Sequence, residues 1–276
     1  MDLIIQGIEI ETSDLRQLAK LSGASKIERI NGNAFRLIDA SQRDRISSLC
    51  LEAELDFAFV DERKSLNQFR LIAMDMDSTL VGIETIDEIA DIHGMRKQVA
   101  EITEKAMYGE INFSEGLIQR VALLKGLEHS VLQRVYDERL IFNPGAEKML
   151  KKLKVAGIKT MLISGGFTFF TDKLKDRLGL DYTFANTLET VNGRLTGRLL
   201  GEVCGAKGKG WALNKICNEL GFRKENLIAI GDGANDLSMF AEAGVSIAYH
   251  AKPIVQENAT YAINHVGLDG VINIFQ

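Results

Sequence analysis

Short apolar runs alternate with helical patterns along most of the chain, and this alternation limits the possible folds more than any other feature. The runs have the length of buried strands. They lie at residues 69–74, 159–163, 182–188, 227–230 and 245–248. One of the helical patterns between them, from Phe167 to Leu178, is followed by Gly179, a residue type that favours a helix end. Strands that alternate with helices form a mostly parallel sheet with helices on both faces, so we expect an α/β core of the Rossmann-like type at residues 68–276.

The first 67 residues predict a separate, smaller domain. Residues 26–30 and 34–38 alternate in polarity around Asn31-Gly32, a dipeptide that favours a β-hairpin. One helix is expected after a cap at residues 12–14, and a second from Ser41 to about Leu55. With strands at 3–8 and 57–60, the order is βαββαβ, the ferredoxin-like pattern of an α+β domain. This order fits a structural appendage as well as a unit that binds a small ligand or forms a dimer.

A helical insertion interrupts the α/β pattern after its first strand. Helical periodicity runs through residues 84–142, and Asn112-Phe113-Ser114 marks the point where one helix stops and another begins. We therefore expect an all-helical cap at about residues 84–142, inserted into the core.

Composition and charge argue against several functions. The net charge of −5 and the absence of a basic stripe argue against nucleic-acid binding. No apolar stretch approaches the roughly 20 residues of a membrane helix, and the first residues do not resemble a signal peptide. The three cysteines and four histidines lack zinc-site spacing. We expect a cytoplasmic protein that does not act at a membrane.

Two carboxylates follow the first apolar run, in Asp75-Met76-Asp77-Ser78-Thr79. Residues two apart on a strand point to the same side, and two such carboxylates repel each other unless a cation or a shared proton lies between them. A hard divalent cation with oxygen ligands would satisfy this requirement. A solvated turn is the alternative explanation of the same pattern.

Two further polar loops follow later strands, at the same edge of the expected sheet. Ser164-Gly165-Gly166 is expected to open a helix and to offer backbone N–H groups to an anion. The segment 231–236 adds the carboxylates of Asp232 and Asp236 to the cation site, although turn formation would also explain these residues.

A cationic residue is expected from the segment 205–210, which lacks the Walker A pattern. Lys207 and Lys209 both fit this position, and a surface lysine is the alternative for each. Lys209 is preferred because it directly precedes the helical pattern of residues 210–213.

Together these segments resemble, in order and spacing, the four motifs of the haloacid dehalogenase superfamily, and within it the phosphoserine phosphatase family. The resemblance covers about residues 69–276 and includes three cap segments, 84–90, 107–113 and 120–125. The N-terminal domain resembles, more weakly, the ACT-like domains of some bacterial members, which suggests a homodimer formed through it.

The resemblance implies Mg²⁺-dependent hydrolysis of O-phosphoserine, the last step of serine biosynthesis. Asp75 would be the nucleophile that forms an aspartyl-phosphate, and Asp77 the general acid and then the base. A carboxylate can approach a phosphate only if the charge is neutralised, and Ser164 and Lys209 would hold the phosphoryl oxygens. The implied metal ligands are Asp75, Asp77 through its backbone carbonyl, and Asp232. The implied substrate-binding residues are Glu84, Met107, Phe113, Arg120, Ser164, Gly165, Gly166, Lys209 and Asn235, with Asp236 in support.

The cap residues distinguish phosphoserine from other esters. Glu84 would meet the ammonium of the substrate, Arg120 would bind its carboxylate through a planar fork, and Met107 and Phe113 would wall the pocket. The alternative for Glu84 and Arg120 is a solvated helix face. The alternative functions are phosphatase or phosphotransferase activity on another small phosphomonoester, and a sensor that binds a small ligand.

Overall fold

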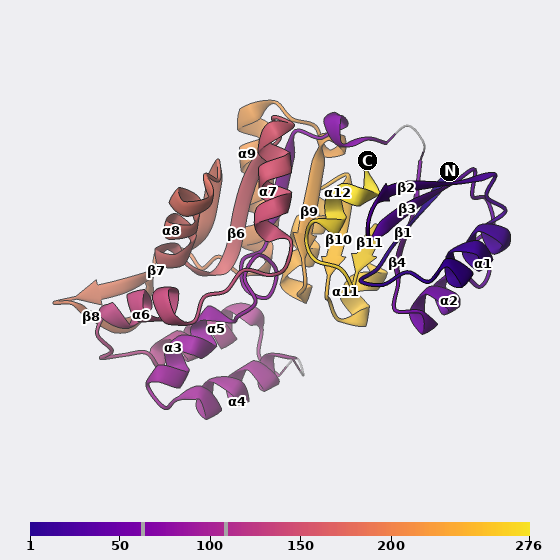
Figure 1. The fold of residues 1–276 in the computed structure, drawn as a ribbon. Coiled ribbons are helices and arrows are strands. Elements are labelled where there is room, and N and C mark those ends of the chain that lie inside the picture. Colours follow the sequence, from indigo (N-terminus) through magenta and orange to yellow (C-terminus); the bar gives the residue numbers. More distant parts are fainter. Residues whose placement is uncertain (62–63, 108–109) are drawn as a thin grey trace.

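The computed structural model describes residues 1–61, 64–107 and 110–276. Figure 1 shows three parts: an N-terminal unit at one side, a central α/β core, and a group of helices below the core. Within the described residues, the N-terminal unit has a four-stranded sheet and the core has a seven-stranded sheet. No helix in these ranges is long and apolar enough to cross a membrane.

The N-terminal unit has the predicted order βαββαβ. Its sheet has the order β2-β3-β1-β4, and all neighbouring strands are antiparallel, as in the ferredoxin-like fold. Its elements are β1 (Asp2–Gln6), α1 (Thr12–Ser22), β2 (Lys26–Asn31), β3 (Ala34–Ile38), α2 (Ile46–Glu52) and β4 (Asp56–Val60).

Both helix starts in this unit differ from the prediction. Helix α1 begins at Thr12, after Glu11, and no side chain caps it. Helix α2 begins at Ile46, several residues after Ser41. Arg45 has a φ of 63°, in the left-handed region, and this backbone conformation prevents the helix from extending toward Ser41.

The central sheet of the core is mostly parallel, as predicted. Its strand order is β11-β10-β9-β5-β6-β7-β8, and only β8, paired with β7, is antiparallel among the described strands. Strand β5 therefore lies between β9 and β6, and the three predicted polar segments lie at the carboxyl ends of these strands. The strands are β5 (Leu71–Met74), β6 (Lys159–Phe167), β7 (Tyr182–Val191), β8 (Arg194–Leu200), β9 (Leu227–Gly231), β10 (Val245–Tyr249) and β11 (Tyr261–Ile263).

Helices cover both faces of this sheet. Alternate residues of β5 show this: Ile72 and Met74 pack on the face of α7, α8 and α12, whereas Leu71 and Ala73 pack on the face of α9, α10 and α11. The last strand and helices, β11, α11 and α12, were not anticipated from the sequence. The helices are α7 (Ala146–Val155), α8 (Thr168–Leu178), α9 (Ala206–Leu220), α10 (Leu237–Ala241), α11 (Pro253–Glu257) and α12 (Gly270–Ile274).

Helices also form where the cap insertion was expected, between β5 and α7. They are α3 (Thr85–Ile92), α4 (Arg96–Met107), α5 (Phe113–Ala122) and α6 (Ser130–Glu138). Asn112 begins α5 as predicted: its side chain accepts a hydrogen bond from the N–H of Glu115, and the Glu115 side chain accepts one from the N–H of Asn112. Figure 1 shows this cap below the core.

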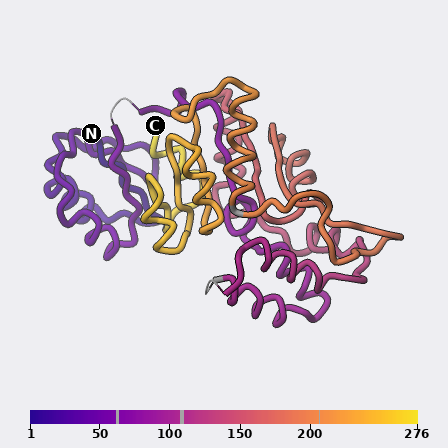
Figure 2. The backbone as a smooth tube through the Cα atoms, turned by 180° about the vertical axis from the view of Figure 1, so that it is seen from behind, coloured from indigo at the N-terminus to yellow at the C-terminus, as the bar shows by residue number. Residues whose placement is uncertain are grey.

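The N-terminal unit is packed firmly against the core. Ile4 of β1 belongs to the main core cluster, whereas its neighbours Leu3 and Ile5 pack against α1 and α2, so β1 is buried on both faces. The buried carboxylate of Asp56 accepts hydrogen bonds from the backbone N–H groups of residues 264–266. Figure 2 shows the unit beside the C-terminal segment. A loosely tethered appendage would not bury its strands in this way.

Candidate active site

Asp75 begins the site at the carboxyl end of β5. Its backbone N–H donates to the carbonyl of Ile230 in β9 across 3.0 Å, and its own Oδ1 accepts from the N–H of Met76 across 2.7 Å. The side chain is buried. The sheet order thus brings the three predicted loops together, as expected for the carboxyl edge of a parallel sheet.

Lys209 connects two of these loops. Its Nζ lies 2.7 Å from Oδ2 of Asp75 and 2.6 Å from Oδ1 of Asp236, and the side chain is fully buried. Burial alone would lower the pKa of Lys209, but the charges of Asp236 and Asp75 outweigh burial and raise it. Lys207 is exposed, so Lys209 is the lysine of this segment that reaches Asp75.

The position of Lys209 relative to its helix was predicted wrongly. Helix α9 begins at Ala206, after the extended Gly205, so Lys209 lies in the first turn of the helix instead of before it. The glycines at 208 and 210 concealed this start, because glycine is a poor helix former.

Three carboxylates lie close enough together to hold a metal ion. One oxygen from each of Asp75, Asp232 and Asp236 lies within 4.8 Å of the others. Burial and the charge of Asp236 raise the pKa of Asp75 well above its usual range, and the same two causes raise the pKa of Asp232 to about 6. A bound cation would relieve this repulsion, and an all-oxygen ligand set fits a hard divalent ion.

The acidic cluster differs from the predicted metal set in one member. Asp236 contributes a carboxylate oxygen to it, as the residue pattern predicted, whereas the family resemblance implied only a supporting role. The carboxylate of Asp77 points elsewhere, so a metal contact through its backbone carbonyl stays a prediction. Thr79 Oγ1 donates to Asp232 Oδ1 across 2.8 Å and thereby fixes that carboxylate.

The Asp77 carboxylate lies between the cap and the carboxyl end of β6. Its Oδ1 accepts a hydrogen bond from the backbone N–H of Thr85 across 2.8 Å, and its Oδ2 one from Ser164 Oγ across 3.3 Å. Burial is the largest influence on this group and raises the pKa of Asp77. A carboxyl group whose protonated form is favoured can act as an acid near neutral pH.

The Ser164-Gly165-Gly166 segment does not open a helix, contrary to the prediction. Strand β6 continues through it to Phe167, and α8 begins only at Thr168. Asn186 of β7 holds the segment extended, because its Nδ2 donates to the carbonyl of Gly165 across 2.9 Å. The N–H of Gly166 donates to Ser164 Oγ across 2.8 Å and orients that hydroxyl.

Glu84 and Arg120 of the cap face the same space as Asp77. Glu84 Oε1 accepts a hydrogen bond from Ser78 Oγ across 2.7 Å, and burial raises the pKa of Glu84 to about 8. The half-buried Arg120 feels the charges of Asp87, Glu84 and Asp77, although burial is the larger effect and lowers its pKa. The structure therefore brings together one acidic and one basic group opposite the core carboxylates.

Of the remaining predicted residues, Phe113 contacts the segment that carries Ser164. A Cβ atom at Gly165 would lie only 2.9 Å from Cζ of Phe113, so the cap touches the loop that carries Ser164. Asn235 lies beside Asp236 in the 3₁₀ turn η3 (Ala234–Asp236). Met107 ends α4, but its side chain lies outside the part of the chain that the structure describes in detail.

Sequence reasoning missed two residues that support these loops. Asn143 donates from Nδ2 to the carbonyls of Ser78 and Thr79, across 3.1 and 2.8 Å. Asn186 accepts the N–H of Cys204 across 2.6 Å. An asparagine that bonds to a distant backbone leaves no local pattern, and only the step Asn143-Pro144 hinted at a turn.

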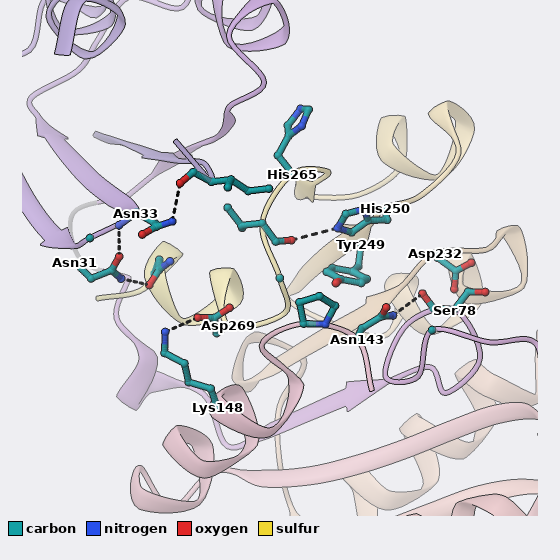
Figure 3. A pocket seen from close by; sticks show the side chains of 17 residues that line it. Asn31, Asn33, Ser78, Asn143, Lys148, Asp232, Tyr249, His250, His265 and Asp269 are labelled. Carbon is teal, nitrogen blue, oxygen red and sulfur yellow. Dashed lines mark hydrogen bonds and ion pairs between the residues drawn. The ribbon is translucent and has the colours of Figure 1, made fainter. Parts of the chain in front are cut away.

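A cavity of about 680 Å³ lies beside the site, between the core and the N-terminal unit. Figure 3 shows Ser78 and Asp232 at one end and the hairpin residues Asn31 and Asn33 at the other. The asparagines are bonded within the protein: Asn31 Nδ2 donates to Asn273, and Asn33 Nδ2 donates to the carbonyl of Ile8. The cavity therefore separates the N-terminal hairpin from the loop of Asp232.

Comparisons with known proteins agree with this architecture. The family model of haloacid dehalogenase-like hydrolases matches residues 69–244, and the model of a domain of unknown function, DUF4072, matches residues 3–46. A phosphoserine phosphatase of Polaromonas sp. (strain JS666) is 52% identical over 214 residues, which are 76% of this chain and 91% of the relative.

Two solved structures extend the agreement to the fold. A haloacid dehalogenase family hydrolase of Salmonella enterica serovar Typhi has a TM-score of 0.90 at 32% identity, covering 100% of this chain and 98% of that one. A substrate-bound phosphoserine phosphatase complex has a TM-score of 0.71 at 43% identity, covering 75% of this chain and 99% of that one. The chain therefore belongs to the haloacid dehalogenase-like hydrolase family.

Proposed function

We infer that this chain hydrolyses O-phosphoserine to serine and inorganic phosphate in a metal-dependent reaction, which would complete serine biosynthesis. One observation carries the choice of substrate: Glu84 and Arg120 of the cap lie near enough to feel each other's charge and that of Asp77. An amino-acid phosphate has an ammonium, a carboxylate and a phosphate. Glu84 would bind the ammonium, Arg120 the carboxylate, and the core residues the phosphate. The relatives named phosphoserine phosphatases support the same choice.

In the first half of the reaction, a carboxylate oxygen of Asp75 attacks phosphorus while the bond to the serine oxygen breaks. The Asp77 carboxyl group gives its proton to that leaving oxygen, and its raised pKa favours the protonated form that this step needs. The products are serine and a phosphoryl group on Asp75, so one slow hydrolysis becomes two easier steps.

In the second half, the Asp77 carboxylate takes a proton from water while the water oxygen attacks phosphorus. The bond to Asp75 breaks and its carboxylate returns with the electron pair. Asp77 is left protonated for the next substrate. Lys209 and Ser164, which contact Asp75 and Asp77 directly, are placed to hold the phosphoryl oxygens through both steps.

We propose Mg²⁺ as the metal, held by Asp75 and Asp232 with Asp236 close by. Their crowded carboxylates fit a hard divalent cation, as described above. Such an ion would neutralise the phosphate charge and allow the approach of a carboxylate nucleophile. Lys209 supplies a second positive charge at the same place.

We expect purified protein to release phosphate from L-phosphoserine when Mg²⁺ is present, and to lose this activity when EDTA removes the metal. Mg²⁺ added in excess of EDTA should restore the rate. Turnover of another monoester but not of phosphoserine would keep the mechanism and discard the substrate. Serine binding without turnover of any ester would favour the sensor hypothesis.

Arg120→Ala should raise the KM for phosphoserine by about 10- to 100-fold, because a charge-assisted contact to the substrate carboxylate is lost. Esters without a carboxylate should be turned over as by the wild type. Arg134→Ala is the matched control, since Arg134 lies on the exposed side of α6, where it pairs with Glu138. An unchanged KM for phosphoserine would remove Arg120 from the substrate site.

A homodimer through the N-terminal unit remains part of the proposal. One face of its sheet packs on the C-terminal segment, and β4 lies near β11 of the core. Strand β2 is an edge strand of this sheet: it pairs with β3 on one side, and its residues are largely exposed. An edge strand of this kind can pair with a second copy.

A further inference from the structure

The carboxylate of Asp77 bridges the core and the cap. Its Oδ1 is bonded to the backbone N–H of Thr85, the first residue of the eight-residue helix α3. Its Oδ2 faces the core, where Ser164 Oγ donates to it and a Cβ atom at Gly166 would lie 2.8 Å away. The cap thus occupies one oxygen of the proposed acid, and the other remains for proton transfer in the core.

Thr85 brings a second polar group to the same place. Among the residues that the structure describes, its Oγ1 is the one buried side-chain nitrogen or oxygen without a hydrogen-bond partner, and the residue is 1% exposed. The N–H of the same residue is bonded to Asp77 Oδ1, so the hydroxyl lies near that carboxylate. An unpartnered buried hydroxyl is costly, so its position beside Asp77 points to a role there.

We propose that Thr85 is the positioning residue of Asp77. Its N–H holds Oδ1, its hydroxyl is poised to add a second hydrogen bond, and Oδ2 is thereby directed toward Ser164 and the reacting phosphate. The inference rests on the proposed function, because it concerns the orientation of the acid in that reaction. Thr85 itself touches neither the phosphate nor the nucleophile.

The position of Thr85 also couples substrate recognition to catalysis. Thr85 directly follows Glu84, the proposed ligand of the substrate ammonium, and Glu84 forms the extended N-cap of α3. The residue that would bind the substrate ammonium and the residue that holds Asp77 are therefore neighbours in the chain, and the N–H of Thr85 already contacts Asp77. A shift of Glu84 would therefore also shift the group that orients the acid.

Thr85→Pro tests the backbone contact, because it removes the N–H. Proline is favoured at the first position of a helix, and the extended Glu84 has the backbone that a following proline requires. We expect kcat for phosphoserine to fall about 10²-fold, as for a misplaced catalytic group. KM should stay within about threefold of the wild type, because Glu84 and Arg120 still bind the substrate.

Thr12→Pro is a matched control for this substitution. Thr12 is the first residue of α1, follows the extended Glu11, and is exposed in the N-terminal unit. It should leave kcat and KM unchanged. Circular dichroism and thermal unfolding of both variants show whether they fold.

The hydroxyl is tested separately, and this test holds even if Thr85→Pro fails to fold. Thr85→Val keeps the shape and the N–H but lacks the hydroxyl, so kcat should fall about 3- to 10-fold, the worth of one hydrogen bond. Thr85→Ser keeps both groups and should retain the wild-type kcat.

Three results would overturn the proposal while the wild type remains active on phosphoserine. They are a kcat of a folded Thr85→Pro equal to that of Thr12→Pro, a rise in KM alone, and equal losses in the serine and valine variants. Inactive wild type would instead refute the proposed function, so the two failures are distinguishable.

Discussion

Asp75→Asn is expected to reduce phosphate release from phosphoserine by more than about 10⁴-fold, the scale at which loss of a nucleophile acts. The amide has almost the same shape, but it is a poor nucleophile and cannot form the aspartyl-phosphate. Two contacts fix the orientation of the Asp75 carboxylate: Lys209 Nζ lies 2.7 Å from its Oδ2, and the N–H of Met76 donates to its Oδ1.

The fold should survive this substitution. Lys209 keeps its contact of 2.6 Å with Asp236, and one of three crowded carboxylates loses its charge. Burial and then repulsion from Asp236 raise the pKa of Asp75, so its neutral replacement should not lower the unfolding temperature of the metal-free protein.

Asp181→Asn is the control for this measurement. Asp181 lies at the other end of the sheet, where it pairs with Lys159 across 2.6 Å and accepts the N–H of Thr160. It should retain full activity. A rate for Asp75→Asn within about tenfold of the wild type would assign the nucleophile to another residue.

The sequence was sufficient for the parts of the site that lie directly after strands. Asp75, Ser164 and Asp232 each follow an apolar run, and parallel strands place their carboxyl ends at one edge. A local pattern and one rule of sheet geometry were therefore enough to predict that these segments lie together. The βαββαβ order of the first domain was predictable for the same reason, because each element has its own periodicity.

The errors arose where a distant contact decides the backbone. The Ser164-Gly165-Gly166 segment stays extended because Asn186 binds the Gly165 carbonyl, and no feature of the segment itself indicates that partner. The close packing of the two domains depends in part on Asp56, which binds backbone groups 208 to 210 residues further along the chain. Patterns of neighbouring residues cannot encode such a distance.

The role of Asp236 shows the same limit on a smaller scale. The residue pattern placed Asp236 at the cation site and the family resemblance gave it only a supporting role, because its orientation depends on Gly233 and Lys209. The N–H of Gly233 donates to Asp236 Oδ2 across 3.0 Å, and Lys209 binds Oδ1. Spacing alone does not determine which oxygen of a turn carboxylate faces a metal.

Lys209→Met should reduce both the activity and the stability of the protein. Removing one partner of a buried ion pair typically costs about 3–5 kcal/mol, because the other charges are left without compensation. Here Asp75 and Asp236 both lose their contact with Nζ, and all three side chains are buried. Activity should fall by about 10²- to 10³-fold, since a charge that stabilises the transferring phosphoryl group is missing.

Lys207→Met is the matched control, because Lys207 lies two residues away in the same helix and is exposed. Its free energy of unfolding should change by less than about 0.5 kcal/mol. If both variants unfolded at the wild-type temperature, the ion pairs of Lys209 would contribute nothing to the fold.

Mg²⁺ provides a further test of the prediction for Lys209→Met. If Mg²⁺ binds the cluster of Asp75, Asp232 and Asp236, it supplies positive charge to the same carboxylates that Lys209 contacts. Mg²⁺ should then raise the unfolding temperature of Lys209→Met more than that of the wild type, because the variant has more uncompensated charge. Activity should not return with stability, because an ion among the carboxylates cannot replace the donor that Lys209 offers to the phosphoryl oxygens. Recovery of both would mean that Lys209 acts only as a structural counter-charge.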